Sequence, residues 1–156
     1  MRHLLATCLA VLLGLLTFLA APATAPVSAA TTGPRISEVL AANSRTVPDA
    51  QGHYHDWLEL HNPTASPLSL AGYTLTDNPI QPGKWPLPAT TLAPGAFVVV
   101  WASGEDRATP DGWHTNFRLD RDGDYLGVFD PAGQLVDGVA FSAQQADVSL
   151  GRLAAG

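Results

Sequence analysis

Three histidines and two carboxylates gather in one short stretch of the chain, and this composition suggests transition-metal chemistry. The stretch holds His53, His55 and His61 together with Asp56 and Glu59. Imidazole nitrogens and carboxylate oxygens are common ligands of Zn²⁺. On an extended strand, however, residues 53 and 61 lie more than ~25 Å apart at ~3.3 Å per residue, so the three imidazoles cannot meet one ion. A polar loop that leads into a half-exposed strand is the favoured interpretation, with Asp56 bracing the loop. A weak metal site on His53 and His55 is the alternative.

A second group of carboxylates surrounds Gly123 and has the opening spacing of a calcium loop. Asp120, Asp122 and Asp124 alternate along this segment. An EF-hand loop requires a glutamate seven residues after Asp124 and flanking helices, but Pro131 occupies that position. We interpret the segment as a solvated hairpin, with a weak calcium site as the alternative. We expect no other cofactor.

The sequence offers little for nucleophilic catalysis. It has no Gly-x-Ser-x-Gly elbow, no phosphate-binding glycine loop and no dinucleotide fingerprint. Ser103 follows an apolar run without an oxyanion framework, and nothing in the spacing joins it to His114 in a triad. We therefore predict that the chain is not an enzyme.

Exposed aromatic rings can stack on sugars, so exposed tryptophans are candidate carbohydrate-binding residues. Trp101 lies in the most hydrophobic run and is predicted to be a core residue. Trp85 and Trp113 lie in segments predicted to be loops, and they are the candidate binding residues for a glycan or another partner.

The N-terminus has the features of an export signal. Arg2 and His3 precede an apolar stretch from Leu4 to Ala21, and a segment of small residues follows. We predict a signal peptide over residues 1–29, cleaved after Ala29, a linker over residues 30–34, and a secreted or extracytoplasmic location. An uncleaved membrane anchor is the alternative.

The charge balance argues against nucleic acid as a partner. The chain has 8 basic and 14 acidic residues. Removal of the signal peptide would take away Arg2, which leaves 7 basic against 14 acidic residues and a net charge of −7. Phosphate backbones are bound by clustered lysines and arginines, which this chain lacks. The same cleavage would remove Cys8, the only cysteine, so the folded domain must be stable without disulfides.

These groups must be positioned by strands, because no helix of ordinary length is evident. Glycine, proline, asparagine or aspartate interrupts every apolar run within about ten residues, as in sandwiches and barrels. Residues 43–54 and 103–113 are predicted to be polar loops, 115–119 to be extended, and Pro94-Gly95, Asp122-Gly123 and Asp130–Gly133 to be turns. The main predicted strands are 36–41, 56–61, 73–76, 96–101, 125–129 and 135–141. The prediction is an all-β fold, an immunoglobulin-like antiparallel β-sandwich of about seven to nine short strands.

Several motifs resemble the lamin-tail domain family in its secreted bacterial form, over about Ile36 to Arg152. They include the Asp56–Pro63 run, the His114–Phe117 segment and the Asp147–Arg152 segment. The resemblance implies a β-sandwich module without enzymatic activity, attached in bacteria to exported enzymes or surface proteins. It also implies that the matching residues are structural marks and not an active site: Asp56, Trp57, Glu59, Asn62, Pro63, His114, Asn116, Gly151 and Arg152.

Together these observations predict a secreted, non-catalytic interaction or adhesion module over residues 35–156. Its partner would be a protein or a cell-surface glycan, held by loops near residues 43–55, 77–91 and 103–114. The alternative is a carbohydrate-binding or weakly calcium-binding accessory domain of a longer exported enzyme. Members of the family usually continue past the Gly151-Arg152 motif, so we also expect that a closing strand is missing or that the sequence is a fragment.

Overall fold

The computed structural model describes residues 32–152, and the predicted signal peptide lies outside this range. The described chain is built from β-strands and connecting loops. No helix long and apolar enough to cross a membrane occurs among residues 32–152. The strands are β1 (Arg35–Leu40), β2 (Trp57–His61), β3 (Leu68–Ser69), β4 (Thr74–Thr76), β5 (Trp85–Pro86), β6 (Thr91–Leu92), β7 (Phe97–Trp101), β8 (Arg107–Thr109), β9 (Gly112–His114), β10 (Gly123–Phe129), β11 (Leu135–Ser142) and β12 (Leu150–Gly151).

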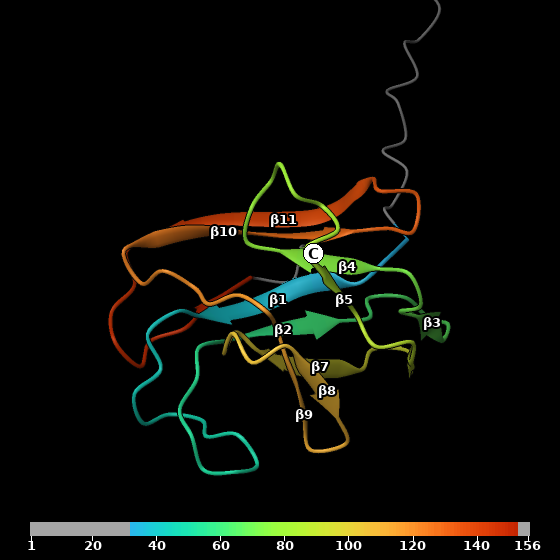
Figure 1. The fold of residues 1–156 in the computed structure, drawn as a ribbon. Helices are drawn as coiled ribbons and strands as arrows, with labels where there is room; N and C mark the ends of the chain where they lie inside the picture. Colours follow the sequence, from blue (N-terminus) through green and yellow to red (C-terminus); the bar gives the residue numbers. More distant parts are fainter. Residues whose placement is uncertain (1–31, 153–156) are drawn as a thin grey trace, which may run out of the picture.

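Two sheets form the layers of a sandwich (Figure 1). One has the strand order β12-β1-β2-β7-β9-β8, and the other has the order β11-β10-β4-β5. β3 and β6 form a separate two-stranded pair. The core between the layers is apolar, with fully buried side chains from both sheets: Leu58, Leu60 and Val100 from one, and Leu75, Leu126 and Val128 from the other. The predicted all-β sandwich is thus confirmed.

The alternation in β2 explains why this strand is central. Leu58 and Leu60 point into the main core, as their spacing predicts. Trp57 points to the opposite face, where it packs with Leu40 and Trp101 in a second, smaller apolar cluster. This end of the larger sheet is therefore buried on both faces, which matches the predicted core role of Trp101.

Three details of the strand prediction were wrong. Residues 32–152 form twelve strands, more than the seven to nine predicted, because several pairings involve only two or three residues. The predicted polar loop 103–113 contains the β8–β9 hairpin, and β9 pairs with β7 in parallel, so the sandwich is not entirely antiparallel. The predicted extended segment 115–119 makes only an isolated bridge, between Arg118 and Ser103.

The glycine turns formed where the sequence indicates them. Gly95 has a φ of 68°, and the Ala96 amide donates to the Ala93 carbonyl at 3.0 Å ahead of β7. Gly133 has a φ of 75° in the turn that joins β10 to β11. The Asp122-Gly123 turn is also present, but it leads from a loop into β10 and joins no hairpin.

Candidate functional site

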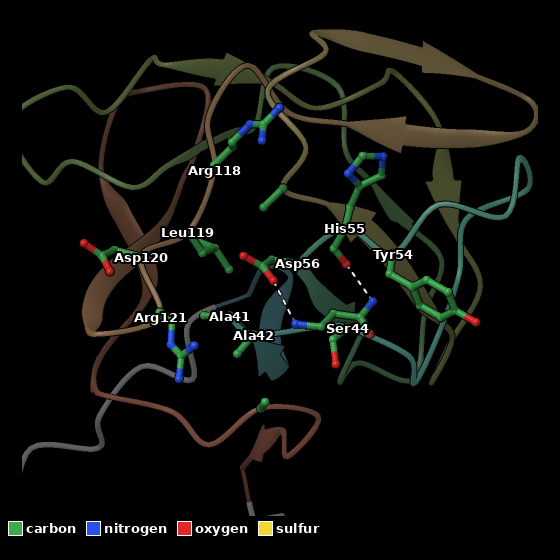
Figure 2. A pocket seen from close by; sticks show the side chains of 13 residues that line it. Ala41, Ala42, Ser44, Tyr54, His55, Asp56, Arg118, Leu119, Asp120 and Arg121 are labelled. Carbon is green, nitrogen blue, oxygen red and sulfur yellow. Dashed lines mark hydrogen bonds between the residues drawn. The ribbon is translucent and has the colours of Figure 1, made fainter.

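An open cleft of about 630 Å³ lies at one end of the larger sheet, beside the end of β1 and the start of β2. Small side chains, including Ala41, Ala42 and Ala102, line part of it. Figure 2 shows Tyr54 and His55 on one side of Asp56, and Leu119, Asp120 and Arg121 on the other. The cleft therefore presents charges of both signs and an aromatic ring around a lining of small residues.

Asp56 braces the loop that forms one wall of this cleft. Its carboxylate accepts a hydrogen bond from the Asn43 amide at 2.9 Å, and the Asn43 side chain donates to the carbonyls of Val47 and His55. Burial raises the pKa of Asp56, and the Asn43 hydrogen bond with the charges of His55 and Arg118 partly opposes this rise. The predicted bracing role of Asp56 is thus confirmed.

Asp147, which lies between β11 and β12, binds the beginning of the same loop. Its carboxylate accepts hydrogen bonds from the Ser44 and Arg45 amides at 2.8 and 3.0 Å, and from the Ser44 and Thr46 hydroxyls at 2.6 and 2.9 Å. The side-chain hydrogen bond from Ser44 is the largest cause that lowers the pKa of Asp147 far below its usual range.

Acid is therefore expected to release this anchor. Because the folded-state pKa of Asp147 is lowered, its stabilising effect is complete above the ordinary aspartate pKa of about 4 and is lost progressively as the pH falls from there towards the lowered folded-state pKa. We expect Asp147→Asn to lower the melting temperature clearly at pH 7 and by less at pH 3, where part of this stabilisation is already lost. Thermal unfolding of both proteins at the two pH values checks this. An equal difference at both would show that the ionised carboxylate is not the stabilising group.

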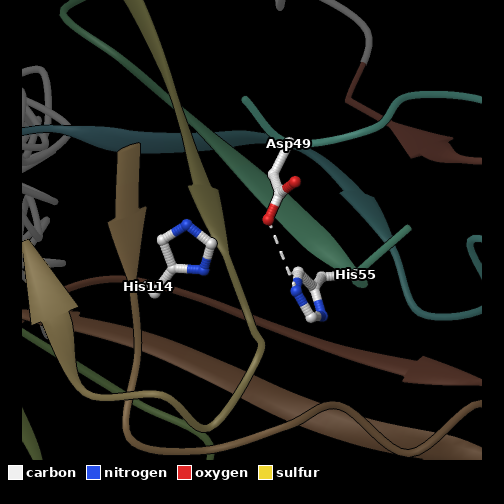
Figure 3. Close-up of side chains that lie close together, drawn as sticks. All are labelled: Asp49, His55 and His114. Carbon is white, nitrogen blue, oxygen red and sulfur yellow. Dashed lines mark ion pairs between the residues drawn. The ribbon is translucent and has the colours of Figure 1, made fainter. Parts of the chain in front are cut away.

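A cluster of three ionisable side chains, Asp49, His55 and His114, lies behind the cleft wall (Figure 3); we call it the Asp–His–His cluster. One ring nitrogen of each histidine and one carboxylate oxygen of Asp49 all lie within 4.8 Å of one another. Asp49 lies in the long β1–β2 loop, His55 lies two residues before β2, and His114 is the last residue of β9. The parallel pairing of β9 with β7 brings His114 to this place, since Trp101 and His114 are register partners.

Asp49 is positioned by a tight turn of its own loop. Its Oδ1 accepts hydrogen bonds from the Gln51 and His53 amides at 2.9 and 2.8 Å, and Gly52 takes a φ of 86° to complete the turn. The other oxygen, Oδ2, is left to face the imidazoles, 3.5 Å from His55 Nε2. Burial acts to raise the pKa of Asp49, but the two amide hydrogen bonds and the nearby histidines outweigh it and lower the pKa. Asp49 is therefore a carboxylate at neutral pH.

His114 is fully buried and held from one side. Its Nδ1 lies 3.0 Å from the Ser103 hydroxyl and 3.4 Å from a Glu105 carboxylate oxygen. Burial lowers the pKa of His114, and the charge of Arg107 lowers it further, against the opposing effect of Glu105. The imidazole is therefore neutral at pH 7, the form that ligates metals.

Glu105 and Arg107 form the charged rim of the cluster. Glu105 Oε1 lies 3.5 Å from His55 Nε2, and its Oε2 lies 2.7 Å from Arg107 Nε. Arg107 also reaches towards Asp49 Oδ2, at 3.9 Å. The hydrogen bond from Arg107 is the main cause that lowers the pKa of Glu105.

Buried polar atoms without a hydrogen-bond partner concentrate in this cluster. Among residues 32–152, four buried side-chain atoms lack a partner: Asp49 Oδ2, His55 Nε2, His114 Nε2 and Trp57 Nε1. Three of the four belong to the cluster. Buried polar groups are almost always paired, so an accumulation of unpaired ones points to a ligand or a functional role.

The cluster differs from the histidine site considered from the sequence. His55 lies against both His114 and His53, with ring centroids 5.7 and 5.8 Å apart. His53 is not part of the cluster, and its side chain is 67% exposed. His61 lies on β2 and stacks on Phe97 at 4.2 Å between ring centroids. Asp49 was missed. The Pro-Asp-x-x-Gly pattern indicates its turn, but not the direction of its free oxygen.

Two of the three calcium candidates around Gly123, Asp120 and Asp124, accept local hydrogen bonds. Asp120 accepts from the Asp122 amide at 2.9 Å, and Asp124 accepts from the Asp120 and Tyr125 amides at 3.0 and 2.8 Å. These contacts form a turn that leads into β10, so the hairpin predicted at this point is not present. The weak calcium site stays a prediction.

The tryptophan candidates require a correction. Trp85 is 3% exposed and belongs to the main core, because β5 pairs with β4 and turns the indole inward. Its assignment as a surface ligand was therefore wrong. Trp113 is partly buried and packs against the same core. Tyr54, at 45% exposure, is the aromatic ring that the cleft presents.

The remaining sequence marks make structural contacts. Glu59 accepts a hydrogen bond from Ser37, Asn116 donates to the Lys84 carbonyl, and Arg152 pairs with the buried Asp137. Asn62 is fully buried, and its side chain donates hydrogen bonds to backbone carbonyls. Pro63 follows the end of β2, and Gly151 lies in β12.

Ser103 and His114 do meet, although the spacing gave no reason to join them. The arrangement still differs from a catalytic triad, because Ser103 and Glu105 both approach the same ring nitrogen, Nδ1. A triad requires the nucleophile and the acid on opposite nitrogens. Both Ser103 and His114 are also buried, so a substrate has no access to the hydroxyl.

Comparison with protein families places these features in a known group. The model of the Lamin Tail Domain family matches residues 27–143, which is most of the chain. A comparison with curated protein sequences finds no match. The family match agrees with the two-layered sandwich. The chain therefore belongs to the lamin tail domain family, a family of non-catalytic immunoglobulin-like modules.

Proposed function

We propose that this chain is an exported, non-catalytic interaction module that binds a protein partner through the cleft beside Asp56. The open cleft itself carries the proposal. It is about 630 Å³ in volume and combines small alanines with Tyr54, Arg118 and Arg121 around it. Tyrosine and arginine are the residue types most often found at energetic centres of protein interfaces.

The loop architecture supports a binding role for this end of the sandwich. Loops positioned by a rigid scaffold commonly carry recognition, as in immunoglobulin domains. Here Asp56 and Asp147 hold the long β1–β2 loop at both ends. A loop held in this way can present Tyr54 without a large loss of conformational entropy on binding.

A binding assay with matched variants tests the proposal. We expect labelled full-length protein to bind saturably to envelopes of the source cells, and prior protease treatment of the envelopes to abolish binding. Tyr54→Ala and Arg121→Ala should each weaken binding at least ~10-fold, as expected for exposed interface centres. Phe97→Ala removes another exposed aromatic ring, at the opposite end of β7, and should leave binding unchanged.

The same assay separates the competing explanations. Binding that survives protease but is lost after periodate oxidation would indicate a glycan partner in place of a protein. Equal binding by the wild type, Tyr54→Ala and Arg121→Ala would contradict the cleft as the binding site.

A further inference from the structure

The Asp–His–His cluster has the composition, spacing and burial of a metal site. We propose that Asp49, His55 and His114 bind one divalent transition-metal ion of the Zn²⁺ class, and that this ion ties the long β1–β2 loop to β9. Nothing in the family assignment supplies this site, and it does not depend on the proposed partner binding.

Two separations around His55 fit a shared metal ion better than they fit hydrogen bonds. His55 Nε2 lies 3.5 Å from Asp49 Oδ2 and 3.5 Å from Glu105 Oε1. These separations exceed the usual N–H···O range of ~2.7–3.2 Å. Ligand atoms ~2.1 Å from a tetrahedral Zn²⁺ lie about 3.4 Å from each other. The spacing around His55 Nε2 is thus close to the edge of a zinc tetrahedron.

Burial gives a second, independent indication. The Asp49 side chain is 0% exposed, yet its Oδ2 has no hydrogen-bond partner and faces His55. An ionised carboxylate oxygen in this position is costly unless a cation or a donor neutralises it. A metal ion between Asp49 and the two imidazoles would satisfy that oxygen and complete the site.

The surrounding groups can support such an ion. The Ser103 hydroxyl, 3.0 Å from Nδ1, orients the His114 ring, in the way that second-layer hydrogen bonds orient metal ligands. Glu105 approaches both imidazoles and is the available fourth ligand, or the partner of a metal-bound water. Asp49 and Glu105 carry two negative charges, and Arg107 opposes them with one positive charge.

The ligand set also predicts which metal is preferred. Two imidazole nitrogens and a carboxylate favour Zn²⁺ and similar ions, whereas Ca²⁺ is bound almost entirely by oxygen. The competing account has no metal. In it, Arg107 and the contacts with His55 balance the charges of Asp49 and Glu105 without an ion.

The consequence for the fold is a cross-link at the cleft. The ion would join Asp49 and His55, at the end of the long loop, to His114 on β9. His55 also lines the cleft. Metal binding would therefore fix one cleft wall in place.

Titration of the metal-free full chain tests the proposal. After treatment with a chelator, we expect one Zn²⁺ to bind per chain by calorimetry and elemental analysis, with a rise in melting temperature. Co²⁺ in place of Zn²⁺ should give the visible absorption of a four-coordinate site. His55→Ala and Asp49→Asn should each weaken Zn²⁺ binding at least ~100-fold, since each removes a direct ligand. The Asp49→Asn variant retains a side-chain oxygen for the turn that Gln51 and His53 close.

Matched controls separate this site from other ligands in the chain. His61→Ala removes an imidazole that stacks on Phe97 outside the cluster, and Cys8→Ser removes the only thiol of the sequence; both should bind Zn²⁺ like the wild type. Ca²⁺ should give no comparable rise in melting temperature. The proposal is overturned by substoichiometric Zn²⁺, by equal binding of the Asp49→Asn and wild-type proteins, or by loss of binding in Cys8→Ser. The no-metal account predicts the first of these results.

Discussion

Replacement of Asn62 by alanine is expected to lower the free energy of unfolding by about 3 kcal/mol, since several hydrogen bonds are lost at a buried position. The Asn62 side chain is fully buried and its Nδ2 donates to three carbonyls, those of Ser66, Leu92 and Ala93, at 2.9–3.1 Å. Its Oδ1 accepts from the amide and hydroxyl of Thr64. One side chain thus joins the turn after β2 to the turn before β7. Urea denaturation measures the loss.

A second asparagine provides the matched control for this substitution. Asn116 is exposed and donates a single hydrogen bond, to the Lys84 carbonyl at 2.8 Å. Asn116→Ala should therefore cost less than about 1 kcal/mol. Similar losses for both variants would show that the buried network of Asn62 does not stabilise the fold.

Replacement of Arg152 by alanine is expected to cost about 2 kcal/mol, less than a fully buried pair because solvent screens the partly exposed guanidinium. Arg152 Nη1 lies 2.7 Å from both carboxylate oxygens of Asp137, which is 8% exposed and also accepts from the Ile36 amide. Loss of the guanidinium leaves a buried carboxylate without its cation. The pair links β11, β1 and the end of β12, so its loss should also expose the β1 edge. Denaturation measures the first effect, and hydrogen exchange of the β1 amides measures the second.

A double-mutant cycle isolates this ion pair. In an Asp137→Asn background, which removes the charge, Arg152→Ala should cost clearly less than in the wild type. Arg45→Ala removes an arginine that is 85% exposed and paired with Asp147, and it should cost at most about 1 kcal/mol. Additive effects of the substitutions at 137 and 152 would rule out the proposed coupling.

Local patterns in the sequence account for most of the fold. The alternation around Leu58 and Leu60, and the turns at Gly95 and Gly133, act over a few residues and appear in the structure as predicted. The prediction failed where tertiary contacts decide. Trp85 lies in a proline-rich segment that indicates a loop or an edge strand; it forms an edge strand, and pairing with β4 places its indole in the core, which the sequence did not show. The β8–β9 hairpin likewise depends on a tertiary contact, the parallel pairing of β9 with β7.

The candidate sites were less predictable for the same reason. The sequence indicated that His55 could bind a metal. The spacing along an extended strand left only His53 as its expected partner. His55 does lie beside His53, but its other neighbours, Asp49 and His114, come from a loop turn and from a parallel strand pairing. Neither contact leaves a periodic pattern in the sequence. The cleft depends in the same way on segments far apart in the chain, including Ala42, Asp56 and Arg121.

The central claim is that this lamin tail domain binds its partner at the loop end of the sandwich, and a footprint of the bound protein tests it most directly. Hydrogen–deuterium exchange of the free and envelope-bound protein compares protection of every amide. We predict that binding protects both cleft walls, residues 41–56 and 118–121, and leaves the turn at residues 93–97 unchanged. Protection confined to the 93–97 end or to the outer faces of the sheets would contradict this account.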